Sequence, residues 1–176
     1  MKAGRKMIGV VLIAGFCLVG AAVPGYGQNE KFAYVDIAKV FDNYEKTKDQ
    51  DRTLQEAGRK KEEERDALVH QIRQLKDEMV LLNDEAKEKK QGELETKVRG
   101  LQDYDQQAKQ ALGEQRREIV REIFKDIDDT VQRYGERKGL DFIFNEKSLI
   151  YHTAHYDATE EILKDLNKSY VKQGKK

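Results

Sequence analysis

The side chains best suited to chemistry in this 176-residue sequence are three histidines and 33 Asp and Glu residues. His152 and His155 stand three residues apart, but a zinc site needs further ligands, and no Cys or patterned third ligand accompanies them. His70 lies in a charged stretch without patterned partners. The carboxylates are scattered along segments of helical character, and no glycine-rich phosphate loop is present. These features predict a protein that is not an enzyme and that carries neither a metal nor a cofactor.

A second group of residues suits binding rather than chemistry. Met79, Val80, Leu81 and Leu82 are four consecutive apolar residues within a strongly charged region. A narrow helical seam cannot bury four neighbours, because successive side chains point around the helix axis. Met79 and Leu82 fall on the seam. Val80 and Leu81 are therefore the better candidates for contact with an apolar partner, although all four remain candidates.

The overall composition favours extended helices. The chain is 38% charged, with Lys+Arg 33 against Asp+Glu 33, and it contains no Trp. Such a composition suits long exposed helices better than a compact globule. Disorder is the alternative for a chain of low hydropathy, but the regular apolar periodicity described below argues against it. The balanced charge gives no reason to expect binding to nucleic acid.

The N-terminal segment differs from the rest of the chain. Three basic residues precede the uncharged run 7–23, and Pro24 ends that run. This order predicts a secretory signal peptide, residues 1–27, cleaved after Gly27. An uncleaved anchor is the alternative, for which the run is slightly short. Without the signal peptide the chain is formally −3, has no Cys or Pro, and is not expected to insert stably into a membrane.

The middle segment, residues 46–135, predicts a helical hairpin. Its apolar residues follow the four-and-three spacing of a heptad seam, first at Leu68, Ile72, Leu75, Met79 and Leu82, then at Leu94, Val98 and Leu101. An almost wholly polar stretch, residues 84–93, separates the two series and predicts the turn, near Gly92. One continuous helix is the alternative, but it would leave both seams without a partner on the same chain.

Four residues interrupt the seam of the predicted hairpin. They are Gly58, Lys61, Arg65 and Asp105. Glycine weakens a helix, and charged residues at seam positions reduce its apolar contact. The interruptions indicate arms that bend, or thin exposed helices that tolerate such residues.

The two ends of the chain, residues 28–45 and 136–176, predict a small body. Residues 32–35 are of strand type, and Asp36 is placed to cap a short helix. The body is the part of the chain that supplies the strands of the predicted fold class, which is α+β and mostly α.

The C-terminal half of that body is predicted to contain two strands and a helix. The segments Leu140–Phe144 and Leu149–Tyr151 are mostly apolar and contain aromatic and β-branched residues, with a turn-prone stretch between them. Asp157 and Glu160 have the spacing of a capping box, which predicts the start of the final helix.

A body of this size is marginal on its own. Its two pieces together hold 59 residues, fewer than a domain usually needs for a large core. Its exposed strand edges also need covering. Association of several copies would solve both problems, and the predicted oligomer core consists of Phe32, Tyr34, Val35, Phe41, Phe142, Phe144 and Ile150.

The whole pattern resembles the Skp/OmpH family of periplasmic chaperones. The resemblance covers essentially all of the chain after the signal peptide: an opening strand and short helix, a charged helical hairpin, and closing strand and helix segments. The matching residues are Val35, Asp36, Val40 and Phe41 near the start, and Asp157, Thr159, Ile162 and Leu163 near the end. Each motif is soft, and their order is more specific than any one of them.

The resemblance implies a homotrimer with a β-rich body and three hairpin arms around a central space. It implies a periplasmic holdase that binds unfolded outer-membrane proteins without ATP and prevents their aggregation. For such a protein, the apolar residues 79–82 identified above are the candidate client contacts. One feature departs from the family, because many relatives are strongly basic whereas this chain is formally −3 after signal removal.

Two other functions are compatible with a helical hairpin. A structural coiled-coil adaptor or spacer of the cell envelope would bind a folded partner, but its seams should be continuous and stiff. A prefoldin-like chaperone shares the arms-on-a-body design but works in the cytosol, which the predicted signal peptide argues against.

Overall fold

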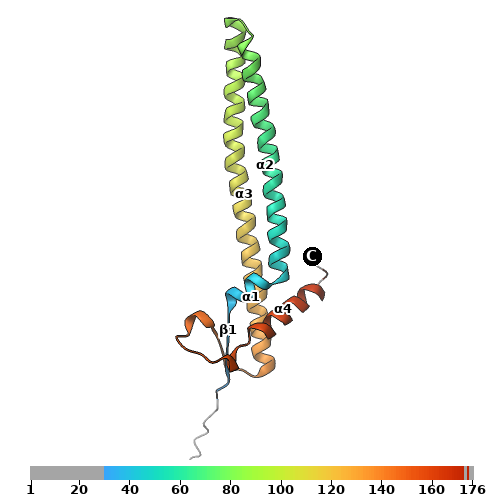
Figure 1. Cartoon of the computed structure of the whole chain (residues 1–176), viewed down its shortest axis with the longest axis vertical. Coiled ribbons are helices and arrows are strands. Elements are labelled where there is room, and N and C mark those ends of the chain that lie inside the picture. The colour runs from blue at the N-terminus through green and yellow to red at the C-terminus, as the bar shows by residue number, and fades with distance from the viewer. Residues whose placement is uncertain (1–29, 173, 175–176) are drawn as a thin grey trace, which may run out of the picture.

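The computed structural model describes residues 30–172 and 174, and the predicted signal peptide lies outside them. The elements, in chain order, are β1 (Phe32–Val35), α1 (Ile37–Asn43), α2 (Glu45–Val80), α3 (Asp84–Lys138), β2 (Phe142–Asn145), two short 3-10 turns (Glu146–Ser148 and Ala154–Tyr156) and α4 (Thr159–Lys172). Figure 1 shows α2 and α3 as a long antiparallel hairpin standing on a small body built from both ends of the chain. The predicted class, α+β and mostly α, is confirmed.

A short helix, α1, joins the first strand to the hairpin arm. The carboxylate of Asp36 accepts a 3.0 Å hydrogen bond from the backbone N–H of Lys39, so it caps α1 as predicted. Tyr44 then adopts an extended conformation, with φ −67° and ψ 128°, between α1 and α2. This single extended residue ends one helix and redirects the chain into the arm.

The turn of the hairpin lies earlier than predicted. Leu81, Leu82 and Asn83 separate α2 from α3, whereas residues 84–93 form the first turns of α3, so the predicted turn position was wrong. The side chain of Asn83 accepts a 3.0 Å hydrogen bond from the N–H of Ala86 and starts the helix there. The polar stretch lacks a seam, but most of its residues are good helix formers, so it persists as exposed helix.

The apolar seam of the arm is tight only in its upper part. Ile72 and Leu75 are buried, with 8% and 4% of their surface exposed, and Leu94 and Val98 of α3 are half-buried. From residue 48 to residue 71, α2 has no buried side chain. The interruptions of the seam at Gly58, Lys61 and Arg65 therefore coincide with a stretch of α2 in which no side chain is buried.

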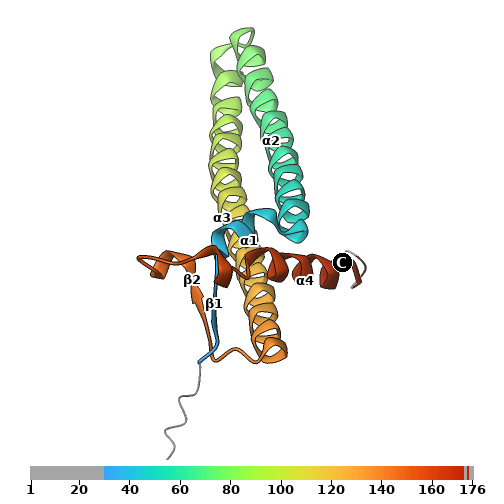
Figure 2. The ribbon, with the colours of Figure 1, turned by 60° about the horizontal axis from the view of Figure 1, so that its bottom comes forward.

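The two strands pair in parallel, with Phe32 opposite Phe142 and Val35 opposite Asn145. Parallel pairing follows from the path of the chain, which rises from β1 through α2, descends along α3 past the body and rises again into β2 (Figure 2). The predicted strand at 140–144 is therefore present, beginning two residues later than expected.

The predicted strand at Leu149–Tyr151 is wrong, because these residues are irregular in the structure. β1 is occupied on both sides, by β2 and by a bridge between Tyr34 and Asp157. The outer edge of β2 has no strand partner within the described part of the chain. Residues 149–151 do not pair with that free edge, so they lack the backbone partner that a strand requires.

The core of the body forms where α3 continues past the base of the arm. Ile123 and Ile127 are 0% and 2% exposed and meet side chains of β1, α1 and α4. The buried cluster consists of Ala33, Val35, Val40, Tyr44, Ile123, Ile127, Tyr134, Ala158, Ile162, Leu166 and Tyr170. The body is thus larger than the predicted segments 28–45 and 136–176, because the last part of the predicted arm, 46–135, supplies one wall of its core.

Two glycines shape the junction between α3 and β2. A Cβ at Gly135 would lie 3.3 Å from Cδ1 of Ile143, so glycine lets β2 pack closely on the helix. Gly139 ends α3 with a left-handed φ of 62°, and its N–H donates a 3.2 Å hydrogen bond to the carbonyl of Glu136.

Truncation of Ile162 to alanine should destabilise the body. This residue of α4 is 0% exposed, and Ile162→Ala is expected to lower the free energy of unfolding by about 2–5 kcal/mol. Urea denaturation followed by circular dichroism measures the loss. Val171→Ala on the same helix, 61% exposed, is the control and should change stability by less than about 0.5 kcal/mol. Equal losses in both variants would contradict the assigned core.

Candidate functional site

Two of the three histidines, His152 and His155, make contacts with neighbouring side chains of the body. Nε2 of His152 lies 3.3 Å from a carboxylate oxygen of Glu146, and its ring is tilted against that of Tyr34 with centroids 4.2 Å apart. His155 packs against the neighbouring ring of Tyr156, at 5.1 Å. Within residues 30–172 and 174, no three His, Cys, Asp or Glu side chains gather as metal ligands would. The arrangement offers surfaces for binding, which lie at the two ends of the molecule.

The first surface is the tip of the arm. Val80 and Leu81 are 75% and 88% exposed, whereas Met79 and Leu82 are half-buried. Leu81 is the C-cap residue that follows α2, and its backbone N–H donates a 3.2 Å hydrogen bond to the carbonyl of Glu78. Because the chain turns here, two large apolar side chains project into solvent at the far end of a charged rod. The structure thus separates the four candidates into an exposed pair and a packed pair.

The charges around the tip are largely paired with one another. Nζ of Lys90 lies 3.3 Å from Glu93 and 3.5 Å from Glu78, and the hydrogen bond to Glu93 is the main reason why the pKa of Lys90 is raised. Lys89 lies 3.6 Å from Glu85. Exposed pairs of this kind contribute little to stability. Because these charges of opposite sign lie next to one another, the tip carries no strongly positive or negative patch. The exposed apolar pair Val80 and Leu81 is therefore its most distinctive feature.

The second surface is one face of the small sheet. Phe32, Phe142 and Phe144 are 43%, 51% and 41% exposed, although all three belong to strands. The rings of Phe142 and Phe144 stack at 6.0 Å. In a strand, alternate side chains share a face, so these residues project together on the side away from α3. Exposed aromatic residues gathered in this way form an apolar patch of the kind that binding surfaces often have.

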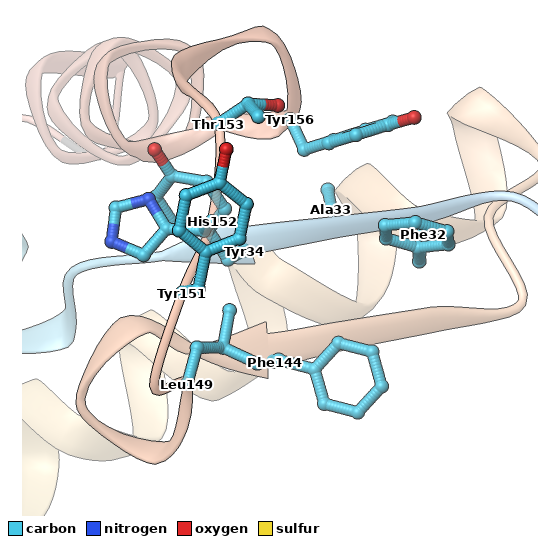
Figure 3. A pocket seen from close by; sticks show the side chains of 9 residues that line it. All are labelled: Phe32, Ala33, Tyr34, Phe144, Leu149, Tyr151, His152, Thr153 and Tyr156. Atoms are coloured by element: carbon cyan, nitrogen blue, oxygen red, sulfur yellow. The ribbon is translucent and has the colours of Figure 1, made fainter.

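An apolar cavity of about 270 Å³ opens on this face of the sheet (Figure 3). It is lined by Phe32, Ala33, Tyr34, Phe144, Leu149, Tyr151, His152, Thr153 and Tyr156. Phe32 and Tyr156 meet at 4.6 Å between ring centroids. Tyr156 was not among the predicted residues, because it stands next to the Asp157 signal for a helix start and carries no strand pattern of its own.

The predicted oligomer core divides into buried and exposed residues. Tyr34 and Val35 are 4% and 2% exposed, so Val35 belongs to the core of the single chain. Phe41 is half-buried and stacks on Phe124 of α3 at 5.3 Å. Ile150 is fully exposed, and Phe32, Phe142 and Phe144 are exposed as described above. The exposed members, which are Phe32, Phe142, Phe144 and Ile150, form the sheet surface together with the free edge of β2.

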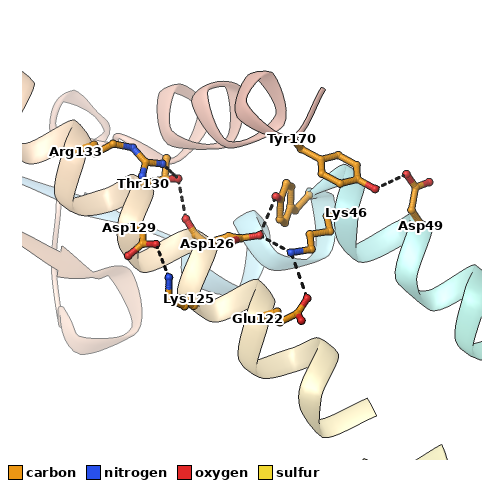
Figure 4. Close-up of polar contacts among 10 residues, drawn as sticks. Lys46, Asp49, Glu122, Lys125, Asp126, Asp129, Thr130, Arg133 and Tyr170 are labelled. Carbon is orange, nitrogen blue, oxygen red and sulfur yellow. Dashed lines mark hydrogen bonds and ion pairs between the residues drawn. The ribbon is translucent and has the colours of Figure 1, made fainter. Parts of the chain in front are cut away.

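A polar cluster anchors the base of the arm to the body (Figure 4). Nζ of Lys46 lies 2.9 Å from Asp126 and 3.5 Å from Glu122, and the hydroxyl of Tyr44 donates a 3.2 Å hydrogen bond to Asp126. The hydroxyl of Tyr170 on α4 donates to Asp49 at 3.0 Å. α2 is therefore tied to α3 and α4 at the point where the two arm helices leave the body.

This cluster changes the titration of its members. Burial by itself lowers the pKa of Lys46, but the hydrogen bond and charge of Asp126, assisted by Glu122, outweigh burial and raise it. Burial and the charge of Asp126 raise the pKa of Tyr44. Both groups therefore hold their protons more tightly in the folded chain.

These features define a class of protein: a charged helical hairpin inserted between the strands of a small body, with apolar surface at both ends. The family model described as outer membrane protein (OmpH-like) matches residues 31–166, and the chain belongs to this family. The predicted resemblance is thereby confirmed.

The fold is also found in a solved structure. The chain is similar to a crystal structure from Caulobacter crescentus CB15 of a protein described as an outer membrane chaperone (OmpH-like). The two share 13% sequence identity with a TM-score of 0.68, over 80% of this chain and 85% of that one. Comparison with curated protein sequences gives no match. Within residues 30–172 and 174, no helix has both the length and the apolar character needed to span a membrane.

Replacement of Lys46 tests the anchor at the base of the arm. Lys46→Met should lower the free energy of unfolding by about 1–3 kcal/mol at neutral pH, because it leaves Asp126 without its cation. Lys125→Met removes an exposed pair with Asp129, whose side chains are 74% and 44% exposed, and should cost less than about 1 kcal/mol.

The anchor also predicts a dependence on alkaline pH. Folding raises the pKa of Lys46 above its ordinary 10.5, so its contribution is complete below that value and is lost as pH rises through the folded-state value. The stability difference between the wild type and Lys46→Met should be constant from neutral pH to about pH 9 and shrink at higher pH. Urea titrations at each pH measure it, and a difference that grew with pH would contradict the assigned anchor.

Proposed function

We propose that this protein is an ATP-independent holdase of the periplasm, which binds unfolded outer-membrane proteins between hairpin arms and prevents their aggregation. The observation that carries the proposal is the exposed apolar pair Val80 and Leu81 at the end of a long charged hairpin. Membership of the OmpH-like family and the similar fold of the OmpH-like protein from Caulobacter crescentus CB15 support it.

The arm has suitable dimensions for enclosing an unfolded chain. α2 contains 36 residues and is about 54 Å long at 1.5 Å per residue. Its surface is charged apart from the tip, so it stays solvated and offers few strong contacts. Each apolar contact that a client makes with such arms contributes about 25 cal/mol per Å² buried. Many weak contacts within one enclosure raise the effective concentration of binding groups, so a client is retained without an ATP-driven cycle.

An enclosure needs several arms, and the sheet surface supplies the means of assembly. The exposed Phe32, Phe142, Phe144 and Ile150 are apolar, and the adjacent edge of β2 offers unpaired backbone groups. A second copy that covers this surface would bury aromatic area and satisfy the free edge together. We take the copy number as three, which is the number implied by the family.

The location of the proposed activity follows from the sequence. The N-terminal 27 residues have the charge, length and apolar run of a cleaved export signal. A periplasmic chaperone works without ATP, and the absence of a glycine-rich phosphate loop from the sequence agrees with this. The structural adaptor remains the competing function, which the following experiment distinguishes.

Replacement of the tip pair tests the holdase directly. Val80→Ser with Leu81→Ser should weaken suppression of aggregation several-fold, because about 1–3 kcal/mol of apolar burial per side chain is lost at each arm. Light scattering of an unfolded β-barrel protein diluted from urea gives the readout. Glu88→Ser with Lys89→Ser, also exposed near the tip, is the matched control and should leave suppression unchanged. A wild-type protein that never suppresses aggregation would favour the adaptor.

A charge placed on the sheet surface should prevent assembly. Ile150 is fully exposed in the single chain, so Ile150→Asp should leave its fold intact, whereas burial of that carboxylate between copies would be strongly unfavourable. Light scattering coupled to size-exclusion chromatography should show a trimer for the wild type and a monomer for the variant. Val171→Asp, exposed on α4, is the control and should remain trimeric. An Ile150→Asp protein of unchanged mass would place the interface elsewhere.

A further inference from the structure

Three polar contacts cross the arm at intervals of seven residues. They are Glu78–Lys90 at 3.5 Å, Gln71–Lys97 at 3.2 Å and Glu64–Tyr104 at 2.6 Å. Each step moves seven residues along both helices, so the contacts form a ladder with the heptad period. If one helix slid by seven residues, Glu78 would meet Lys97 and Gln71 would meet Tyr104. The ladder therefore tolerates a change of register.

The apolar seam tolerates the same change. Its residues also repeat at the heptad period, with Leu68 and Leu75 on α2 and Leu94 and Leu101 on α3. A slide of seven residues again brings leucine opposite leucine. Apolar side chains of similar shape discriminate poorly between such alternatives, because contact is gained in either register.

Two sets of contacts do discriminate between registers: the anchor of Lys46 to Glu122 and Asp126 at the base, and one ion pair along the arm. Nε of Arg65 lies 3.0 Å from Oδ1 of Asp105, and the two side chains are 47% and 44% exposed. A slide in one direction places Arg65 opposite Leu112 and Asp105 opposite Ile72. A slide in the other direction places them opposite Val98 and Gly58. Either slide removes the charge partner and sets a charged group against residues that cannot replace it.

The alternative register is a realistic competitor, because residues 84–93 carry the polar composition of a turn. A turn there requires α2 to continue beyond Val80 and to face later residues of α3. In that register Val80 and Leu81 would lie within a helix, and the tip would consist of charged residues. The register of the arm therefore determines whether its end is apolar or charged.

We propose that the Arg65–Asp105 pair, acting together with the anchor of Lys46 to Asp126 at the base, holds the register along the arm and thereby keeps Val80 and Leu81 at its tip. Arg65 and Asp105 are positioning residues, since they lie far along the arm from the tip. Their importance for client binding rests on the proposed function, but their effect on register does not.

Engineered cysteine pairs report the register directly. In a Cys17→Ser background, Glu78→Cys with Lys90→Cys places two thiols opposite each other across the arm in the observed register, whereas Glu78→Cys with Lys97→Cys does so only after a slide of seven residues. A short bis-maleimide crosslinker, which does not require the thiols to be within disulfide distance, followed by electrophoresis and peptide mass spectrometry, measures intramolecular closure in each. Circular dichroism checks that every variant retains its helix content.

With Arg65 and Asp105 in place, the first cysteine pair should close far more than the second. Arg65→Leu with Asp105→Leu should raise closure of the second pair about threefold to tenfold, in keeping with the strength of a half-exposed ion pair. The exchange Arg65→Asp with Asp105→Arg should restore the original pattern. Arg59→Leu with Glu63→Leu removes an ion pair that does not cross the arm and should change nothing.

Unchanged closure in the double leucine variant would overturn the proposal. So would failure of the exchanged pair to restore the wild-type pattern. The measurement is made without a client, so its outcome is separate from that of the aggregation assay. If the double leucine variant changes the register but the wild-type protein never suppresses aggregation, the role of the Arg65–Asp105 pair is established and the holdase function is refuted.

Discussion

The packing of the lower part of α3 against the two chain ends is the interaction on which the rest of the structure depends. Ile123 and Ile127 contribute to both structural tasks of the molecule, because they belong to an arm helix and also form a wall of the body core. The terminal segments alone hold too few apolar residues for a stable core. Extending one arm helix through the body supplies the missing wall and fixes the direction in which the arm leaves it. The arm and the body are thus parts of one packed unit.

Much of the fold could be predicted from the sequence, because its main elements depend on local patterns. The seam around Ile72 and Leu75, the cap at Asp36 and the β1 strand follow from spacing and residue type. The turn could not be placed, because residues 84–93 have turn composition and helix propensity at once, and the structure uses their helix propensity. The strand expected at Leu149–Tyr151 failed for a related reason, since strand formation needs a backbone partner and not only suitable side chains.

The candidate surfaces were predictable in part. The exposure of Val80 agrees with the width of a helical seam, which can be read from sequence, whereas Leu81 is exposed because the chain turns there. The division of the proposed oligomer core into buried and exposed residues was harder to predict from the sequence. Val35 and Phe142 have similar apolar character, yet one faces α3 and the other faces solvent, and only the position of α3 beneath the sheet decides between them. Composition identified the aromatic residues of the body but could not tell which of them the chain itself covers.

The parallel pairing of β1 and β2 has a consequence for how the molecule acquires its fold. The strands are joined across a separation of 110 residues, as the hydrogen bond from Lys31 to Asp141 illustrates. Closing so long a loop is entropically costly, but prior formation of the hairpin would shorten the effective loop to the few residues at its base. The order of events is then set by topology: local helices first, their association next and the strands last. β1 is synthesised before the other elements, and it can pair with β2 only after most of the chain has been made.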